Sequence, residues 1–170
     1  MKIKNLNKIF IVGPPASGKT FLSDVLSKKL FIKNQGLDSF FWEKKFSKKA
    51  NEKSRNLKLN KFLKNKKWVL EGSYFGRWTN KIYNQSEIIV SLDVPKRILT
   101  KRLLLNRFFK NKKKFPSKEE RNRLKMIIKN TEEIKKEITK KLNERKVIDK
   151  VIFLKGKRDI RHFINQITPS

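Results

Sequence analysis

The sequence predicts an α/β fold in which a five-stranded parallel sheet lies between two layers of helices. Short apolar runs alternate with helix-length segments along the chain, and helices that connect parallel strands pack on the faces of the sheet. The segment 87–92 is almost continuously apolar, which is typical of a strand that is buried on both faces. A glycine-rich turn joins the first apolar run to the first helical segment. Together these observations predict a three-layer α/β/α sandwich.

The individual elements are predicted from hydrophobic periodicity and from local start and stop signals. Pro95 is a favourable first-turn residue, and Ser117 with Glu120 forms a capping box that starts a long, charged helix. The predicted strands are Lys8–Val12, 35–39, 68–70, 87–92 and Val151–Leu154. The predicted helices are Lys19–Leu30, 51–64, 95–109, 117–145 and 159–167.

The composition narrows the class of protein. A length of 170 residues suits a single domain, and the absence of cysteine excludes disulfides and thiolate metal sites. The apolar run after the basic amino terminus is too short for a signal-peptide core, and no stretch approaches the length of a membrane span. We therefore expect a soluble, cytoplasmic protein without a membrane partner.

The formal net charge of +30 leaves two interpretations open. Clustered lysines and arginines bind nucleic acid through the release of counterions. However, the chain is rich in Lys, Asn, Ile and Phe, whose codons are A/T-rich, and its lysines are spread along the chain with a local run at 110–114. A spread positive field attracts any polyanion, including nucleotides. The charge alone therefore does not establish a nucleic-acid partner.

The glycine-rich turn has the pattern G-x-x-x-x-G-K-T of a phosphate-binding loop. Its glycines allow a tight turn whose backbone N–H groups point at a phosphate chain, and the following helix presents its positive dipole end to the same anion. Lys19 is expected to reach the β- and γ-phosphates of ATP, and Thr20 is placed to bind Mg²⁺. The predicted nucleotide-binding residues of the loop are Gly13, Pro14, Pro15, Ala16, Ser17, Gly18, Lys19 and Thr20.

Carboxylates follow three of the predicted strands, which is where ligands of open α/β sheets bind. Phosphoryl transfer needs a carboxylate near Mg²⁺ and often a second one that accepts a proton from the attacking hydroxyl. Glu71 is the candidate for the metal and Asp38 is the candidate for the acceptor, although turn and capping roles remain open for both. Asp93 is expected to cap the next helix. The predicted acceptor-binding residues are Asp38, Trp42, Tyr74 and Arg77.

Several blocks of the chain together resemble the adenylate-kinase-related P-loop proteins often labelled DNA topology modulation proteins. These proteins fall within the wider nucleoside-monophosphate-kinase superfamily. The resemblance extends over nearly the full length of the chain. It is carried by residues 13–20, 37–42, 68–74, 92–95, Arg102, Arg107 and 154–160. The superfamily has an aspartate-glycine pair at the end of the third strand, where this chain has Glu71 and Gly72.

The resemblance implies a P-loop NTPase fold over residues 1–170, with a short lid near 110–117. It implies that Arg102 and Arg107 flank the lid and contact the transferring phosphate and the adenine. It also implies that the turn containing Lys155 and Gly156 packs against the nucleotide base. Asn106 stands where such kinases have a further arginine, and this argues against ordinary AMP phosphorylation.

We therefore expect a kinase that uses ATP and Mg²⁺ and transfers the γ-phosphoryl group to a small-molecule or nucleotide acceptor. The expected catalytic residues are Lys19, Asp38, Arg102 and Arg107. The alternative is an ATP-binding regulatory protein, or an ATPase, that contacts nucleic acid through its basic surface. The sequence identifies neither the acceptor nor the oligomeric state.

Overall fold

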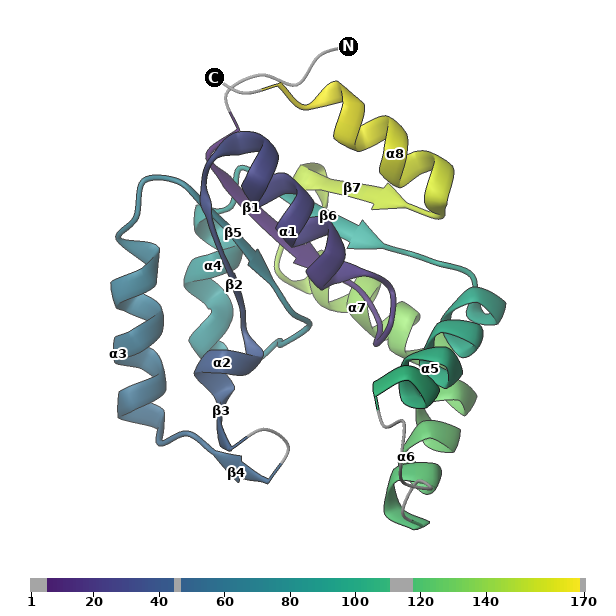
Figure 1. The fold of residues 1–170 in the computed structure, drawn as a ribbon. Helices are drawn as coiled ribbons and strands as arrows, with labels where there is room; N and C mark the ends of the chain where they lie inside the picture. Colours follow the sequence, from purple (N-terminus) through teal and green to yellow (C-terminus); the bar gives the residue numbers. More distant parts are fainter. Residues whose placement is uncertain (1–5, 45–46, 111–117, 169–170) are drawn as a thin grey trace.

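The computed structural model describes residues 6–44, 47–110 and 118–168, and of residues 106–110 it describes the backbone only. Its central feature is a parallel sheet with the strand order β2-β5-β1-β6-β7 (Figure 1). The strands are β1 (Lys8–Val12), β2 (Lys33–Gly36), β5 (Trp68–Glu71), β6 (Ile88–Leu92) and β7 (Val151–Leu154). The predicted five-stranded parallel sheet is confirmed.

Helices and short irregular elements connect these strands. The helices are α1 (Lys19–Leu30), α2 (Asp38–Phe41), α3 (Glu52–Leu63), α4 (Asn80–Gln85), α5 (Lys96–Lys110), α6 (Lys118–Lys129), α7 (Thr131–Glu144) and α8 (Lys157–Gln166). Single 3₁₀ turns are η1 (Arg77–Thr79) and η2 (Ile148–Lys150), and an antiparallel hairpin consists of β3 (Trp42–Lys44) and β4 (Lys48–Lys49). Across the described residues, every helix is too short or too polar to cross a membrane.

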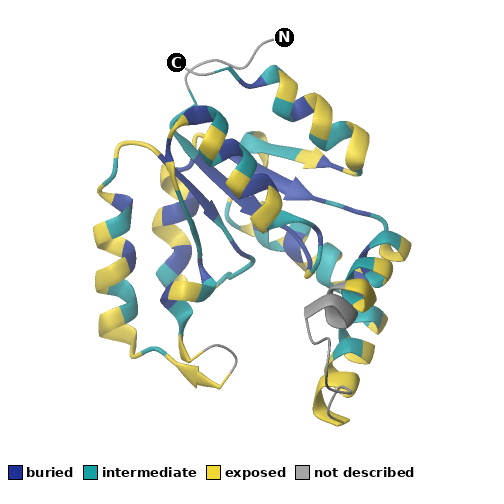
Figure 2. Cartoon of the chain, in the orientation of Figure 1, coloured by how far each residue is buried: buried dark blue, intermediate teal, exposed yellow. Residues whose placement is uncertain are grey.

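The two faces of the sheet carry separate parts of the hydrophobic core. Successive side chains of a strand point to opposite faces. In β1, Ile9 and Ile11 therefore pack with α1, α8 and Leu99 of α5, whereas Phe10 and Val12 pack with α2, α3, α4 and α7. The three central strands β5, β1 and β6 are largely buried, while α6 and the β3–β4 hairpin are mostly exposed (Figure 2). This is the predicted three-layer α/β/α arrangement.

The second strand begins and ends earlier than predicted. Its pairing with β5 ends at Gly36 opposite Glu71, because β5 itself ends there. The chain turns at once, since the backbone N–H of Leu37 donates to the carbonyl of Glu71. Asp38 is therefore the first residue of α2, and the prediction that it ends a strand was wrong. The β3–β4 hairpin, η1 and α4 were not predicted.

The long helix predicted for 117–145 is two helices that are separated at Asn130. The helix α6 has no buried residue, whereas α7 buries Thr131, Ile138 and Leu142, of which Ile138 and Leu142 pack against the sheet. The break therefore lies where the chain changes from an exposed helix to a packed one. Ser117, the predicted capping residue, lies outside the described residues.

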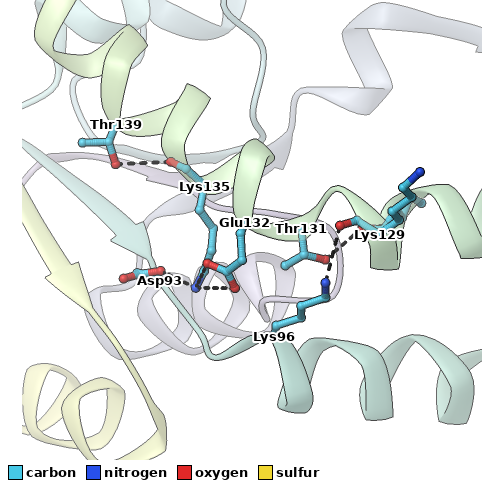
Figure 3. A network of polar contacts seen from close by, with 8 residues as sticks. Asp93, Lys96, Lys129, Thr131, Glu132, Lys135 and Thr139 are labelled. Atoms are coloured by element: carbon cyan, nitrogen blue, oxygen red, sulfur yellow. Dashed lines mark hydrogen bonds and ion pairs between the residues drawn. The ribbon is translucent and has the colours of Figure 1, made fainter.

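Asp93, directly after β6, joins the sheet to α7 (Figure 3). Its carboxylate lies 2.8 Å from the Lys135 ammonium, which also lies 3.4 Å from Glu132. Its backbone N–H donates to the carbonyl of Leu154. On the other side of the same network, Lys96 donates to the carbonyl of Lys129 at 3.4 Å. Asp93 therefore links β6 to α7 and β7, while Lys96 links α5 to the end of α6.

Candidate active site

The loop 13–20 connects β1 to α1 and has the backbone conformation of a cradle. Gly13 and Gly18 have φ angles of 153° and 101°, and Ala16 has a φ of 61°. A Cβ at Gly13 would lie 2.8 Å from the Ser17 hydroxyl oxygen and 3.0 Å from Leu92. No larger residue fits at Gly13 without moving its neighbours, because such contacts and the positive φ both oppose a side chain. The conformation therefore depends on glycine at this position.

Ser73 holds the first residue of the loop. Its hydroxyl accepts from the N–H of Gly13 at 3.0 Å and donates to the carbonyl of Gly13 at 2.7 Å. Because Ser73 follows β5, these two bonds tie the loop to the neighbouring strand end. Ser73 was not among the predicted site residues, although it lies within the block 68–74. The sequence feature that could have identified Ser73 is its position two residues after Glu71, the carboxylate at the end of the strand.

Lys19 folds back over the loop. Its ammonium donates to the carbonyls of Gly13 at 2.9 Å and Pro14 at 3.0 Å. Burial of the ammonium lowers the pKa of Lys19 from its ordinary value, while the carboxylates of Glu71 and Asp38 act in the opposite direction. The structure therefore brings the predicted lysine and the two predicted carboxylates into one electrostatic neighbourhood.

Thr20 and Glu71 face each other across the start of α1. The Thr20 hydroxyl donates to the Glu71 carboxylate at 3.0 Å. A Cβ at Gly36 would lie 2.9 Å from the same carboxylate oxygen, so the glycine that ends β2 leaves room for the Glu71 side chain. Hydroxyl and carboxylate oxygens are ligands that suit Mg²⁺. The pair therefore fits the metal role that was predicted for it.

Arg102 reaches the loop from α5. Its guanidinium donates to the carbonyls of Ser17 at 2.9 Å and Ala16 at 3.4 Å. The side chain of Arg107 lies outside the described residues, as does the predicted lid from residue 111 to residue 117. Of the two arginines predicted to flank the lid, Arg102 is the one whose side chain the structure describes, and it lies directly beside the phosphate-binding loop.

A pocket of about 710 Å³ adjoins the loop and extends toward α8. It is lined by residues 16–20 with Phe21, Arg102, Lys157 and Ile160. The Ser17 hydroxyl is buried and has no hydrogen-bond partner in the described part of the chain. Lys155 and Gly156 precede α8, where the N–H of Lys155 donates to Asp159 at 2.8 Å. The α8 residues that line the pocket therefore come just after the predicted pair.

The predicted acceptor side is rich in aromatic rings. The Tyr74 hydroxyl donates to the Asp38 carboxylate at 2.6 Å, and burial together with this bond raises the pKa of Tyr74 above its ordinary value. The Phe41 ring lies 4.8 Å from that of Tyr74 and 5.0 Å from that of Trp42. Arg77 begins η1 and is exposed. Phe41 belongs to this group but was not among the predicted site residues.

Comparisons with known proteins agree with this architecture. No protein-family model matches the chain. One curated relative, an uncharacterized protein named YqaC from Bacillus subtilis (strain 168), is 33% identical over 96 residues. That match covers 56% of this chain and 53% of the relative, so it spans about half the length of each.

Solved structures of kinases superpose over nearly the whole chain. Shikimate kinase from Acinetobacter baumannii, in complex with shikimate, has a TM-score of 0.56 at 19% identity and covers 95% of this chain and 90% of its own. Shikimate kinase from Bacteroides thetaiotaomicron has a TM-score of 0.55 at 18% identity, and the match covers 95% of this chain and 96% of that chain. A gluconokinase from Sinorhizobium meliloti 1021 has a TM-score of 0.57 at 9% identity, and the match covers 96% of this chain and 90% of that chain. The chain therefore has the α/β/α fold of P-loop kinases.

Proposed function

We propose that this protein is a P-loop kinase that transfers the γ-phosphoryl group of ATP to a hydroxyl or phosphate of a small acceptor. The observation that carries the proposal is the grouping of Lys19, Thr20, Glu71 and Asp38 around the glycine-dependent loop. Phosphoryl transfer relies mainly on positioning and on electrostatic stabilisation, and this group supplies both. We also propose that the protein is specifically related to the DNA topology modulation proteins and that it is located in the cytoplasm.

Each residue has a defined task in this reaction. The loop amides and Lys19 hold the phosphate chain, and Arg102 lies close enough to exchange its loop carbonyls for phosphate oxygens. Thr20 and Glu71 would hold Mg²⁺, which neutralises phosphate charge when it is bound. Asp38 accepts the proton of the acceptor hydroxyl as the acceptor oxygen bonds to the γ-phosphorus. The bond from that phosphorus to the β-phosphate oxygen breaks, and ADP leaves.

The aromatic rings around Asp38 offer an acceptor a flat apolar face, and the exposed Arg77 precedes one of these rings, Trp78, in η1. Two arginines near the aromatic group already have partners within the protein. Arg55 lies 4.9 Å from the Trp78 ring and 3.2 Å from Glu52. Arg145 donates to the carbonyl of Phe75 at 2.5 Å and lies 4.5 Å from the Tyr83 ring. Aromatic rings present flat surfaces against which a sugar or nucleoside packs.

The test is a screen for acceptor-dependent release of ADP from MgATP. The panel contains nucleosides, sugars and shikimate, and matched phosphorylated compounds, with Lys19→Ala as the inactive control. We expect neutral hydroxyl compounds to give the higher turnover, and ATP hydrolysis without acceptor to be slow. Rapid ATP turnover in the absence of any acceptor would contradict a kinase.

The alternative function, a nucleotide-binding protein or ATPase that contacts nucleic acid, rests on the net charge of +30. It is separated from the kinase by titration with DNA at several salt concentrations. Binding through a diffuse charge disappears near physiological salt. Tight, salt-resistant binding that responds to ATP would favour the alternative.

A further inference from the structure

Phe21, the residue directly after Thr20, is an exposed aromatic side chain beside the phosphate-binding loop. Its exposed fraction is 65%. The buried face of α1 consists of Leu22, Ser23, Leu26 and Leu30, so Phe21 lies off the face that packs on the sheet. Packing of the core therefore gives no reason for a phenylalanine at this position.

The pocket next to the loop gives such a reason. Phe21 lines it together with Lys157 and Ile160, which come from the first turn of α8. A triphosphate held by the loop and by Lys19 occupies the end formed by residues 16–20. The rest of a nucleotide must then extend along the remaining volume of about 710 Å³, between Phe21 and α8.

We propose that Phe21 is the platform on which the base of the donor nucleotide stacks, with Ile160 and the stem of Lys157 on the α8 side. This inference rests on the proposed function and adds to it the class of donor. Every nucleobase has a π face, so stacking on an aromatic ring holds any base. Phe21 thus determines how tightly the nucleoside is held, while the loop holds the phosphates.

The same pocket determines selectivity among purines. To tell guanine from adenine, side chains need hydrogen-bond acceptors and donors at the edge of the base, such as carboxylates or amides. Among the described residues that line the pocket, the side chains beyond the loop are Phe21, Arg102, Lys157 and Ile160. Arg102 donates to the loop carbonyls and Lys157 is a donor only, so none of these side chains accepts from the N–H groups that distinguish the edge of guanine from that of adenine. We therefore infer a donor class of nucleoside triphosphates with little discrimination between ATP and GTP.

The experiment measures dissociation constants by calorimetry for MgATP, MgGTP and magnesium tripolyphosphate. The proteins are wild type, Phe21→Ala and Phe21→Trp. The control is Phe31→Ala, which removes a phenylalanine with an exposed fraction of 88% next to the other end of α1. We expect ATP and GTP to bind wild type with similar affinity. In Phe21→Ala both nucleotides should bind about tenfold more weakly, because base–aromatic stacking is lost.

Tripolyphosphate has no base, so its affinity should be the same in all four proteins. In Phe21→Trp, nucleotides should bind as tightly as in wild type and should change the tryptophan fluorescence. Equal loss of nucleotide and tripolyphosphate affinity in Phe21→Ala, or unchanged nucleotide affinity, would overturn the inference. Strong preference of wild type for one purine would overturn the donor class. Failure of wild type to bind tripolyphosphate and nucleotides alike would instead overturn the proposed function itself.

Discussion

The phosphate-binding loop holds its ligand-binding shape through main-chain groups, whereas the region around Asp38 is built from side chains. In the loop, Lys19, Arg102 and Ser73 all bond to backbone atoms of residues 13–17. In the second region, Tyr74 bonds to the Asp38 carboxylate, and Phe41 packs on the Tyr74 ring. Backbone groups recognise a phosphate chain whatever is attached to it. Side chains distinguish one small molecule from another.

This difference explains why the donor side of the site is the better defined one. The loop has one chemical task, and its residues are contiguous in the sequence. The acceptor side combines residues from α2, the β5 end and η1. We expect a change in any of those aromatic side chains to alter which acceptor is used without weakening the binding of phosphate. Single substitutions in each region therefore separate the two experimentally.

The largest effect is expected for Lys19→Ala. Loss of the ammonium should lower kcat/KM by about 10²–10³-fold or more, because a preorganised positive group no longer stabilises the transferring phosphoryl. The affinity for MgATP should also fall, and steady-state kinetics with calorimetry measure both. Lys28→Ala, an exposed lysine of the same helix, is the matched control. Unchanged rate and affinity in Lys19→Ala would refute the role of this residue.

Asp38→Asn tests the acceptor side alone. Removal of the proton acceptor should lower kcat by about 10²–10⁴-fold while the dissociation constant of MgATP stays the same. Tyr74→Phe, which removes the 2.6 Å bond to Asp38 but keeps the ring, should lower kcat much less. Since the pKa of Tyr74 is raised, its hydroxyl stays protonated at pH 10, and wild type should keep this bond there. If Asp38→Asn weakened ATP binding, the two regions would not be separable.

Glu71→Gln tests the metal role at the boundary of the two regions. The amide keeps the size of the side chain but lacks its charge, so the apparent affinity for Mg²⁺ should fall by about 10-fold or more. Titration of activity and of nucleotide binding with Mg²⁺ measures this change. Glu71→Asp, which restores the residue of the wider superfamily, should retain more of the metal dependence than Glu71→Gln. Equal Mg²⁺ requirements in wild type and Glu71→Gln would exclude a metal role.

The smallest effect is expected for Asp93→Asn, at a strand-end carboxylate that belongs to neither region. Its partner Lys135 is partly buried, with an exposed side-chain fraction of 16%. Burial opposes the charge of Lys135, but Asp93 and Glu132 outweigh it and raise the pKa above 10.5. The loss in unfolding free energy should be about 1 kcal/mol or less, with kcat/KM unchanged.

The pH dependence of that loss follows from the sign of the shift. A raised pKa of Lys135 in the folded state stabilises the fold below the unfolded value of 10.5, and this contribution is lost as the pH rises through the folded value. The difference between wild type and Asp93→Asn in urea unfolding should therefore shrink above that pH. A large fall in activity at neutral pH would show that Asp93 belongs to the site.

Much of the architecture was predictable because its signals are local. The alternation of apolar runs and helical segments predicted the sheet and its class, and β1, α1 and β7 have the predicted bounds. The exact end of β2 was not predictable, because it depends on where β5, its distant partner, ends. The break at Asn130 was likewise missed, since it lies where an exposed helix is followed by one that packs on the sheet, and that packing is not visible in the local sequence.

The sequence by itself determined the phosphate-binding loop, because the glycine spacing, the lysine and the flanking strand and helix are all encoded in one contiguous segment, residues 8–30. Only the tertiary structure decided which side chains meet there. The hydrogen bonds from Ser73 to Gly13 and from Tyr74 to Asp38 join residues 60 and 36 positions apart. The contact of Arg102 with Ser17 joins residues 85 positions apart. Such pairs are brought together by the packing of parallel strands, and no local pattern in the chain records them.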